Sequence, residues 1–274
     1  MKYILLNLKR FEIPLALGGI NRGPLAGWAA NLLRDTAAIG SHKDAEFAAF
    51  LPEAHLPQAV AAAQQYGSPM HIGCQSVFRA DVAAGGNFGA FTSNRTALSM
   101  KAIGVDYTLI GHSEERRDKL EMLKEGGAGD FGAVNRLLNK QIHCALAAGL
   151  KVVYCIGENA EEQPRRFDVL REQLQVGLAG VSGAPVIVAY EPIWAIGPGK
   201  TPPDAAYVSE IVQFVKQTAP GLPVVYGGGL KKENAKMLAG IAGLDGGLIA
   251  LTRFSGDFGF YPEEYLEIVS LFLG

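Results

Sequence analysis

The feature that most constrains the fold of this chain is a regular alternation of short apolar runs with longer segments of helical periodicity. The apolar runs, short enough to be buried strands, lie at 3–8, 46–51, 70–73, 107–110, 152–156, 186–189, 224–226 and 247–249. The helical segments lie at 25–36, 56–66, 97–103, 134–148, 165–179, 205–218, 232–239 and 262–271. Eight strands, each followed by a helix, predict an α/β fold of the (β/α)8 barrel type, as a single domain over residues 1–274. A doubly wound open sheet shares this alternation, so the count alone does not exclude it.

Polar residues and glycines at the predicted strand ends favour the barrel. They are Asn7, Lys9, Gln75, the runs 111–114 and 157–158, Glu191 and the run 227–229. In a barrel these strand ends converge on one face, whereas in an open sheet they would lie along an edge. We therefore expect them to surround one site.

Charge and cysteine content exclude several classes of protein. The formal net charge of -2 gives no general attraction to nucleic acid or to an anionic membrane, and pairs such as Arg116 and Arg117 are interpreted as solvated helix ends. Cys74, Cys144 and Cys155 lie in apolar runs, which favours reduced, buried thiols over a disulfide framework.

No apolar run approaches the roughly 18 residues that a membrane span needs. The apolar run in residues 1–10 is too short for a signal peptide and is broken by Asn7 and Lys9. The expected location is the cytoplasm.

Glu191 lies where the predicted strand at 186–189 gives way to a loop that has the features of a lid. Pro192, Gly197 and Gly199 frame an apolar stretch that carries a tryptophan. A single glutamate at a strand end is more often a solvated or capping residue. If the loop closes over a small ligand, however, it expels water, and desolvation raises the pKa of the carboxyl group toward that of a useful base.

Seven short motifs resemble those of triosephosphate isomerases and occur in the same order. They are Asn7-Leu8-Lys9, GAFT at 89–92, GHSE at 111–114, CIGE at 155–158, YEPIWAIG at 190–197, YGG at 226–228 and DGGL at 245–248. The lid and histidine motifs are the specific part of the match. The resemblance implies a TIM barrel that isomerises dihydroxyacetone phosphate and glyceraldehyde 3-phosphate in glycolysis and gluconeogenesis, with no metal and no organic cofactor.

The resemblance also implies catalytic roles. Glu191 would be the base that moves a proton between adjacent carbons, His112 would polarise the carbonyl group and shuttle hydroxyl protons, and Lys9 would place positive charge beside the enediolate. Fixed donors and a cation stabilise such an oxyanion best in a dry site. A helix that starts near Ser113 would favour a neutral imidazole. Taken singly, His112 could be a structural polar residue and Lys9 a surface charge, so the interpretation depends on the three occurring together.

By the same resemblance, Asn7 would hydrogen-bond to the substrate, and Glu114 and Thr92 would hold neighbouring groups in place. The segment 87–94 resembles the family loop that reaches into a neighbouring subunit, which implies a homodimer. An aromatic, glycine-rich protrusion could equally fold back on its own barrel.

The phosphate-binding residues depart from the family pattern. Gly197 matches the lid glycine whose N–H binds phosphate. Gly229 stands where the family has a serine, and Ala250 and Leu251 stand where it has two glycines beside a short helix. Their side chains could keep the backbone from a close approach to phosphate.

Arg253 could compensate as a bidentate phosphate ligand. The alternative is a surface ion pair with Asp257 or Glu263. These departures raise the alternative of a longer substrate, such as a tetrulose phosphate, or of a non-catalytic sugar-phosphate-binding homologue. An unrelated dehydrogenase is disfavoured because no G-x-G-x-x-G motif follows the first strand.

Further departures concern the lid and two loops. Pro198 stands where a threonine is usual, and Pro202 and Pro203 stiffen the far hinge. The chain is longer than its apparent relatives after the first strand, at 11–24, and after Arg117, where 119–131 is predicted to be an irregular, mobile surface insertion. These insertions could enlarge the pocket, change the dimer contact or only cover the surface.

Overall fold

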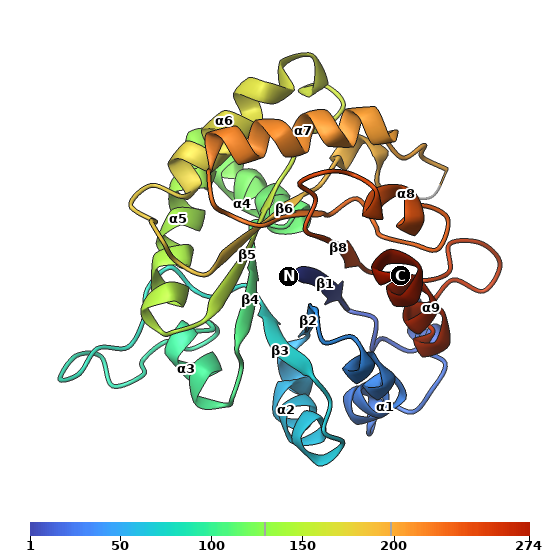
Figure 1. The fold of residues 1–274 in the computed structure, drawn as a ribbon. Helices are drawn as coiled ribbons and strands as arrows, with labels where there is room; N and C mark the ends of the chain where they lie inside the picture. Colours follow the sequence, from blue (N-terminus) through green and yellow to red (C-terminus); the bar gives the residue numbers. More distant parts are fainter. Residues whose placement is uncertain (129, 198) are drawn as a thin grey trace.

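Eight parallel strands close into a barrel in the residues that the computed structural model describes, 1–128, 130–197 and 199–274 (Figure 1). They are β1 (Lys2–Asn7), β2 (Ala45–Leu51), β3 (Met70–Gln75), β4 (Tyr107–Ile110), β5 (Lys151–Ile156), β6 (Val186–Tyr190), β7 (Val224–Tyr226) and β8 (Gly246–Ile249). Each strand pairs with the next, and β1 also pairs with β8 in a register that joins Leu5 to Leu248. The predicted barrel is confirmed, and the open sheet is wrong.

Side chains alternate between the barrel interior and the layer under the helices. Leu5 belongs to the small inner cluster, whereas its neighbours Ile4 and Leu6 belong to the large outer one. Space inside the barrel is tight: a Cβ on Gly73 would lie 2.4 Å from the ring of Phe50. Buried on both faces, each strand has an almost continuous apolar sequence.

The helices surround the barrel (Figure 1). They are α1 (Trp28–Asp35), α2 (Leu56–Gln65), α3 (Ala97–Ala102), α4 (Ser113–Glu125), α5 (Phe131–Ala147), α6 (Arg166–Gly177), α7 (Ala205–Thr218), α8 (Ala235–Ala239) and α9 (Pro262–Leu273). Short 3-10 turns occur at Leu15–Leu17, Ala37–Ser41, Glu53–His55, Gln163–Arg165 and Ile193–Ala195. Every predicted strand and helix is present, with ends that differ by at most three residues.

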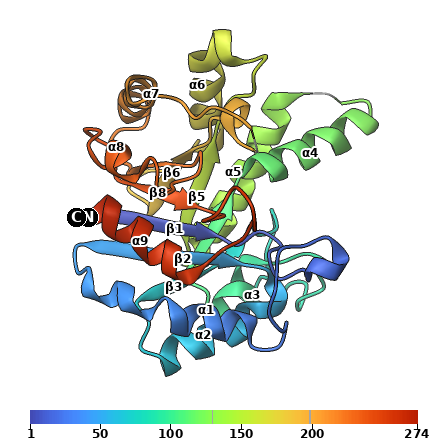
Figure 2. The same ribbon diagram turned by 90° about the vertical axis from the view of Figure 1, so that its right-hand side faces the viewer.

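Helix α4 corrects one prediction. The sequence predicts an irregular segment over 119–131, but α4 continues to Glu125 and α5 begins at Phe131. Leu120 and Leu123 are three residues apart and pack against the outer core cluster, so one stripe of an otherwise polar helix is anchored. Figure 2 shows α4 extending outward from the barrel. Gly129, which belongs to the predicted glycine-rich stretch, lies outside the described residues.

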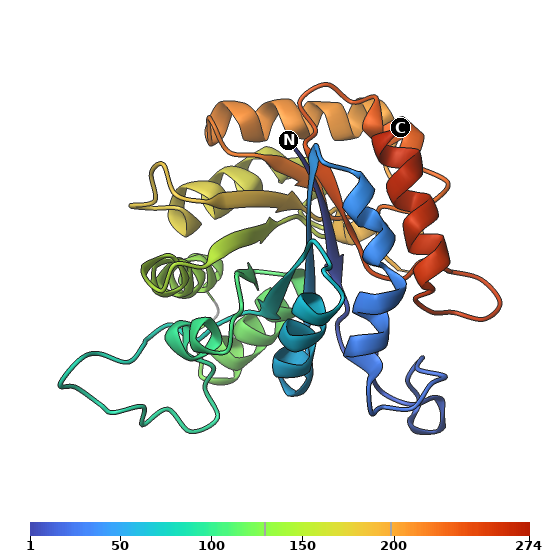
Figure 3. The same ribbon diagram turned by 60° about the horizontal axis from the view of Figure 1, so that its bottom comes forward.

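Two long connections project from the barrel, as Figure 3 shows for the segment after β1 and the segment between β3 and α3. The first contains the 3-10 turn at Leu15–Leu17 and an isolated bridge between Pro14 and Asn21. The second carries Phe88, whose side chain is 91% exposed. None of the helices in the described part of the chain has the length and apolar character to span a bilayer.

Candidate active site

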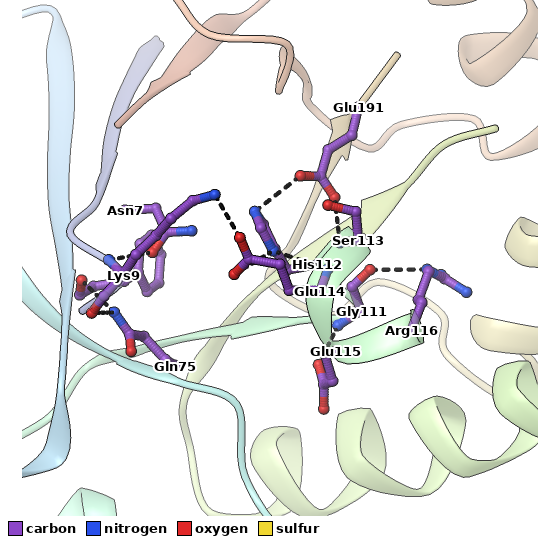
Figure 4. A network of polar contacts seen from close by, with 11 residues as sticks. Asn7, Lys9, Gln75, Gly111, His112, Ser113, Glu114, Glu115, Arg116 and Glu191 are labelled. Atoms are coloured by element: carbon purple, nitrogen blue, oxygen red, sulfur yellow. Dashed lines mark hydrogen bonds and ion pairs between the residues drawn. The ribbon is translucent and has the colours of Figure 1, made fainter. Parts of the chain in front are cut away.

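Polar groups from three strand ends form one chain of contacts at the barrel (Figure 4). Nε2 of His112, after β4, is 3.1 Å from Oε1 of Glu191, after β6. Nδ1 of His112 is 3.7 Å from Oε2 of Glu114, and Oε1 of Glu114 is 2.7 Å from Nζ of Lys9, after β1. The barrel therefore brings together a carboxylate, an imidazole and an ammonium group that are far apart in the sequence.

Glu191 is almost fully buried, at 2% exposure. Burial raises the pKa of its carboxyl group, while His112 and the Ser113 N–H act in the opposite direction. Oε2 accepts the Ser113 N–H at 2.9 Å, and Oε1 faces His112. Each oxygen thus has one partner and keeps a lone pair that can take a proton from a ligand.

The imidazole of His112 is oriented by the helix that follows it. Its Nδ1 accepts the backbone N–H of Glu114 at 3.3 Å, which makes His112 the N-cap of α4. An acceptor Nδ1 carries no proton, so in the neutral ring the proton is on Nε2, which then donates to Glu191.

Lys9 has a backbone conformation that is unusual for a residue with a side chain, with φ of 38°. Its N–H donates to Oδ1 of Asn7 at 3.1 Å, and its carbonyl oxygen accepts from Nε2 of Gln75 at 2.9 Å. Asn7, Lys9, Gln75, His112 and Glu114 line a cavity of about 160 Å³. Gln75 was noted only as a strand-end residue, and its contact with Lys9 is visible only in the fold.

Arg116 supports the histidine loop from behind, so its interpretation as a solvated helix end is wrong. Its Nε donates to the carbonyl oxygen of Gly111 at 2.8 Å, and Nη1 donates to Oδ1 of Asn135 at 2.7 Å. Nη2 donates to the carbonyl oxygen of Cys155 at 2.8 Å and to the hydroxyl of Tyr154 at 2.9 Å. Burial raises the pKa of the Cys155 thiol well above its usual value, which suits a packing residue.

Glu158 anchors the lid. Its Oε1 accepts the hydroxyl of Tyr190 and the indole N–H of Trp194, each at 2.8 Å, and the hydroxyl of Tyr207 at 3.0 Å. Burial raises the pKa of this carboxyl group, although the three donors oppose the rise. Pro198, expected to affect the lid, lies outside the described residues.

Gly157 has no side chain and therefore lets the backbone of Glu191 pack closely against it. A Cβ at this position would lie 2.0 Å from the carbonyl oxygen of Glu191 and 3.2 Å from its Cβ. Only glycine lets the strand end that carries Glu191 approach so closely. The sequence places Gly157 at a predicted strand end but indicates no role for it.

Of the residues expected to bind phosphate, all of which are described, none lines the cavity beside Lys9 and His112. Gly197 and Gly229 have φ of 120° and 91°, a conformation that residues with side chains rarely adopt, which explains why glycine suits position 229. Within residues 250–261, all of them described, no helix forms, and Ala250 and Leu251 lead into a loop instead.

The Arg253 side chain is engaged with α9. Its Nε donates to Oε1 of Glu264 at 2.9 Å, and its guanidinium lies 3.9 Å from the centroid of the Tyr261 ring. The expected ion pair with Asp257 or Glu263 is therefore wrong: Asp257 pairs with Arg22 at 2.9 Å, and Arg253 pairs with Glu264.

Thr92 is exposed in the loop between β3 and α3. Within the described residues it makes no hydrogen bond to the other predicted site residues. The same part of the chain holds no group of three or more His, Cys, Asp or Glu side chains suited to a metal ion.

Comparisons with known proteins agree on one family. The family model for triosephosphate isomerase matches residues 26–269. The chain is 35% identical to the triosephosphate isomerase of Geobacter metallireducens over 182 residues, which cover 62% of this chain and 68% of that protein. It is 33% identical to that of Lactobacillus helveticus over 217 residues, covering 74% and 77%. The crystal structure of triosephosphate isomerase from Bartonella henselae superposes with a TM-score of 0.74 and 26% identity, covering 100% of this chain and 99% of that one.

Proposed function

Because this chain belongs to the triosephosphate isomerase family and is an isomerase of that kind, we propose that it interconverts dihydroxyacetone phosphate and glyceraldehyde 3-phosphate. The observation that carries the proposal is the contact of Glu191 with His112, beside the ammonium group of Lys9. A buried base, a neutral hydrogen-bond donor and a cation are the groups that proton transfer beside a carbonyl needs.

In this mechanism the Glu191 carboxylate removes a proton from the carbon next to the carbonyl group. The C–H electron pair forms the C=C bond of an enediolate, and the carbonyl π electrons move to the oxygen. His112 donates from Nε2 to that oxygen, and Lys9 stabilises its charge. His112 gives its Nε2 proton to that oxygen and takes the hydroxyl proton from the neighbouring oxygen, so the negative charge moves to the second oxygen. The electrons of the second oxygen form the new C=O bond, and the C=C electron pair takes the proton back from Glu191 at the former carbonyl carbon, which completes the isomerisation without loss of atoms.

Oε1 of Glu191 faces Nε2 of His112 at 3.1 Å, so a carbonyl group that accepts a hydrogen bond from His112 must displace this contact. We infer that the ligand inserts between the carboxylate and the imidazole. Closure of the lid would then keep water away from the enediolate.

A longer sugar phosphate, such as a tetrulose phosphate, is the second candidate substrate. It is supported by the loop that follows β8, where Ala250 and Leu251 replace glycines and Arg253 is held by Glu264. These changes alter the phosphate end of the site and leave Glu191, His112 and Lys9 in contact with their partners.

Turnover of triose and tetrulose phosphates by the purified protein separates the candidates. We expect the triose pair to give the higher kcat/KM. A tenfold preference for a tetrulose phosphate would assign the longer substrate instead. Binding of phosphorylated ligands by folded protein without any isomerisation would support the non-catalytic homologue and contradict both assignments.

We also propose a homodimer. The exposed side chain of Phe88, at 91%, and those of Leu15 and Leu17, at 47% and 77%, lie on the two projecting connections and are apolar surface that a second subunit could cover. The elution volume in size-exclusion chromatography with light scattering is expected to correspond to twice 29.1 kDa and to stay constant on dilution. A mass of one chain at micromolar concentration would contradict the dimer.

A further inference from the structure

Glu115 is a carboxylate in the wall of the active-site cavity whose hydrogen-bonding capacity is used by the protein itself. Its Oε2 accepts the N–H of Gly111 at 2.7 Å. Its Oε1 accepts the hydroxyl of Ser76 at 2.6 Å and Nε2 of Gln141 at 2.9 Å, and lies 3.0 Å from Nζ of Lys119. The side chain is 15% exposed and lines the same cavity as Lys9 and His112.

The contact with Gly111 reaches the residue directly before His112. Gly111 has φ of 80°, and a Cβ there would lie 2.9 Å from the carbonyl oxygen of Cys155. Glu115 holds its N–H, and Arg116 holds its carbonyl oxygen at 2.8 Å. Two side chains of opposite charge from the first turn of α4 thus fix both peptide groups that flank Gly111, and with them the position from which the imidazole projects.

The contact with Ser76 reaches the strand end that supports Lys9. Ser76 has φ of 75°, a costly conformation for a residue with a side chain. Its hydroxyl is held by Glu115, and the adjacent Gln75 donates to the carbonyl oxygen of Lys9 at 2.9 Å. One carboxylate is therefore connected to the backbone that carries His112 and, through Ser76 and the adjacent Gln75, to the backbone of Lys9. Figure 4 shows the contacts of Glu115 with Gly111 and of Gln75 with Lys9.

We propose that Glu115 is a positioning residue for the isomerisation, and that it sets the separation between the His112 imidazole and the Lys9 ammonium by fixing Gly111 and Ser76. This inference rests on the proposed function of the site. Glu115 is not a second base: burial raises the pKa of Glu191, whereas Lys119 and the hydrogen bonds from Gly111, Ser76 and Gln141 hold Glu115 in its ionised form.

The charge state of Glu115 agrees with this role. Burial favours the neutral form, but Lys119 and the hydrogen bonds from Ser76, Gly111 and Gln141 outweigh it and hold the pKa of Glu115 below its usual value. A carboxylate that stays ionised accepts hydrogen bonds at both oxygens, whereas an amide of the same shape offers only one acceptor oxygen. Glu115→Gln therefore removes one of the two links without removing volume.

We expect Glu115→Gln to lower kcat about tenfold, because misplacement of a catalytic group by a fraction of an ångström is costly, and to change KM less than twofold. Phosphoglycolate, which resembles the enediolate, should bind about tenfold more weakly, whereas binding of inorganic phosphate should change less than twofold. A purely structural role would not separate these two ligands.

Asp130→Asn is the matched control, because Asp130 also accepts a backbone N–H at the start of a helix, from Gly132 at 2.7 Å, and pairs with Arg136 at 2.8 Å. It should retain wild-type kcat and phosphoglycolate affinity. Ser76→Ala removes the link between Glu115 and Ser76, leaves the carboxylate in place, and serves if Glu115→Gln does not fold; we expect it to lower kcat about threefold.

A folded Glu115→Gln variant with kcat and phosphoglycolate affinity within twofold of the wild type would overturn the proposal, even if its melting temperature fell. If the wild type isomerises neither triose nor tetrulose phosphates, the proposed function fails. The comparison of phosphoglycolate with phosphate needs no turnover, and it still decides whether Glu115 positions the site.

Discussion

Glu191→Gln is expected to lower kcat about 10⁴-fold, at the upper end of what loss of a general base causes. The amide keeps the shape of the side chain, and its one acceptor oxygen can still accept from either Ser113 or His112, but it cannot take a proton from carbon. Substrate affinity should change little, because Lys9 and the residues expected to bind the phosphate group are unchanged. Steady-state kinetics with the triose phosphates measure this directly, and a variant with more than a hundredth of wild-type kcat would exclude Glu191 as the base.

The same variant should be more stable than the wild type at neutral pH. Burial raises the pKa of Glu191 in the folded protein. Between the ordinary pKa and the raised one, the folded state binds more protons than the unfolded state, so wild-type stability falls as pH rises through this window. The amide in the Glu191→Gln variant does not titrate, so the variant does not lose stability as pH rises through this window.

Thermal unfolding of the wild type and of Glu191→Gln, at neutral pH and at a pH below the ordinary carboxyl pKa, tests the sign of the stability difference between them. We expect a higher melting temperature for Glu191→Gln at neutral pH and equal values in acid. Glu210→Gln, which removes an exposed carboxylate paired with Arg166 at 2.9 Å, is the control and should show no such gain. A variant less stable than the wild type at neutral pH would contradict the burial argument.

Lys9→Met is expected to lower kcat/KM about 10³-fold, because the cation beside the developing oxyanion is lost. Methionine has a similar length and must adopt the same φ of 38°, so the backbone cost is unchanged. Glu114 loses its partner at 2.7 Å, but its side chain is 53% exposed and water can replace the ion pair at little cost.

Two controls accompany Lys9→Met. Lys9→Arg keeps the charge and should retain more activity than Lys9→Met. The melting temperature of Lys9→Met should stay close to that of the wild type, which separates loss of catalysis from loss of structure. Activity above a tenth of wild type in Lys9→Met would rule out an essential role for the ammonium group.

The barrel was predictable because strands buried on both faces need apolar sequences, as the runs at 152–156 and 186–189 show. The meeting of Glu191, His112 and Lys9 could also be predicted, since carboxyl ends of barrel strands share one face. Both predictions depend on patterns within a few residues or on a rule of topology, and neither needs side-chain detail.

The supporting residues could not be predicted in this way. Glu158 is surrounded by Tyr190, Trp194 and Tyr207, each of which looks like an ordinary core or lid residue in the sequence. Arg116 stands in a charged run, and its burial depends on residues that lie up to 39 positions later. Their roles come from convergence in space, which no local pattern encodes.

Helix α4 illustrates another limit. Gly126 and Gly127 suggested an irregular segment, but residues 119–125 are all strong helix formers, and the helix ends only at the glycines. Local preference therefore favours a helix up to Glu125, and the glycines mark its end.

The pairing of β1 with β8 has a consequence for synthesis on the ribosome. Lys2–Asn7 leaves the exit tunnel first, yet one of its edges has no partner until Gly246–Ile249 has emerged. Until then the barrel that positions Lys9 is not closed. A stalled or truncated polypeptide would expose the unpaired edges of β1 and β7 to other unfinished chains. Such fragments should be inactive and prone to aggregate. The enzyme can therefore become active only after β8 has been translated.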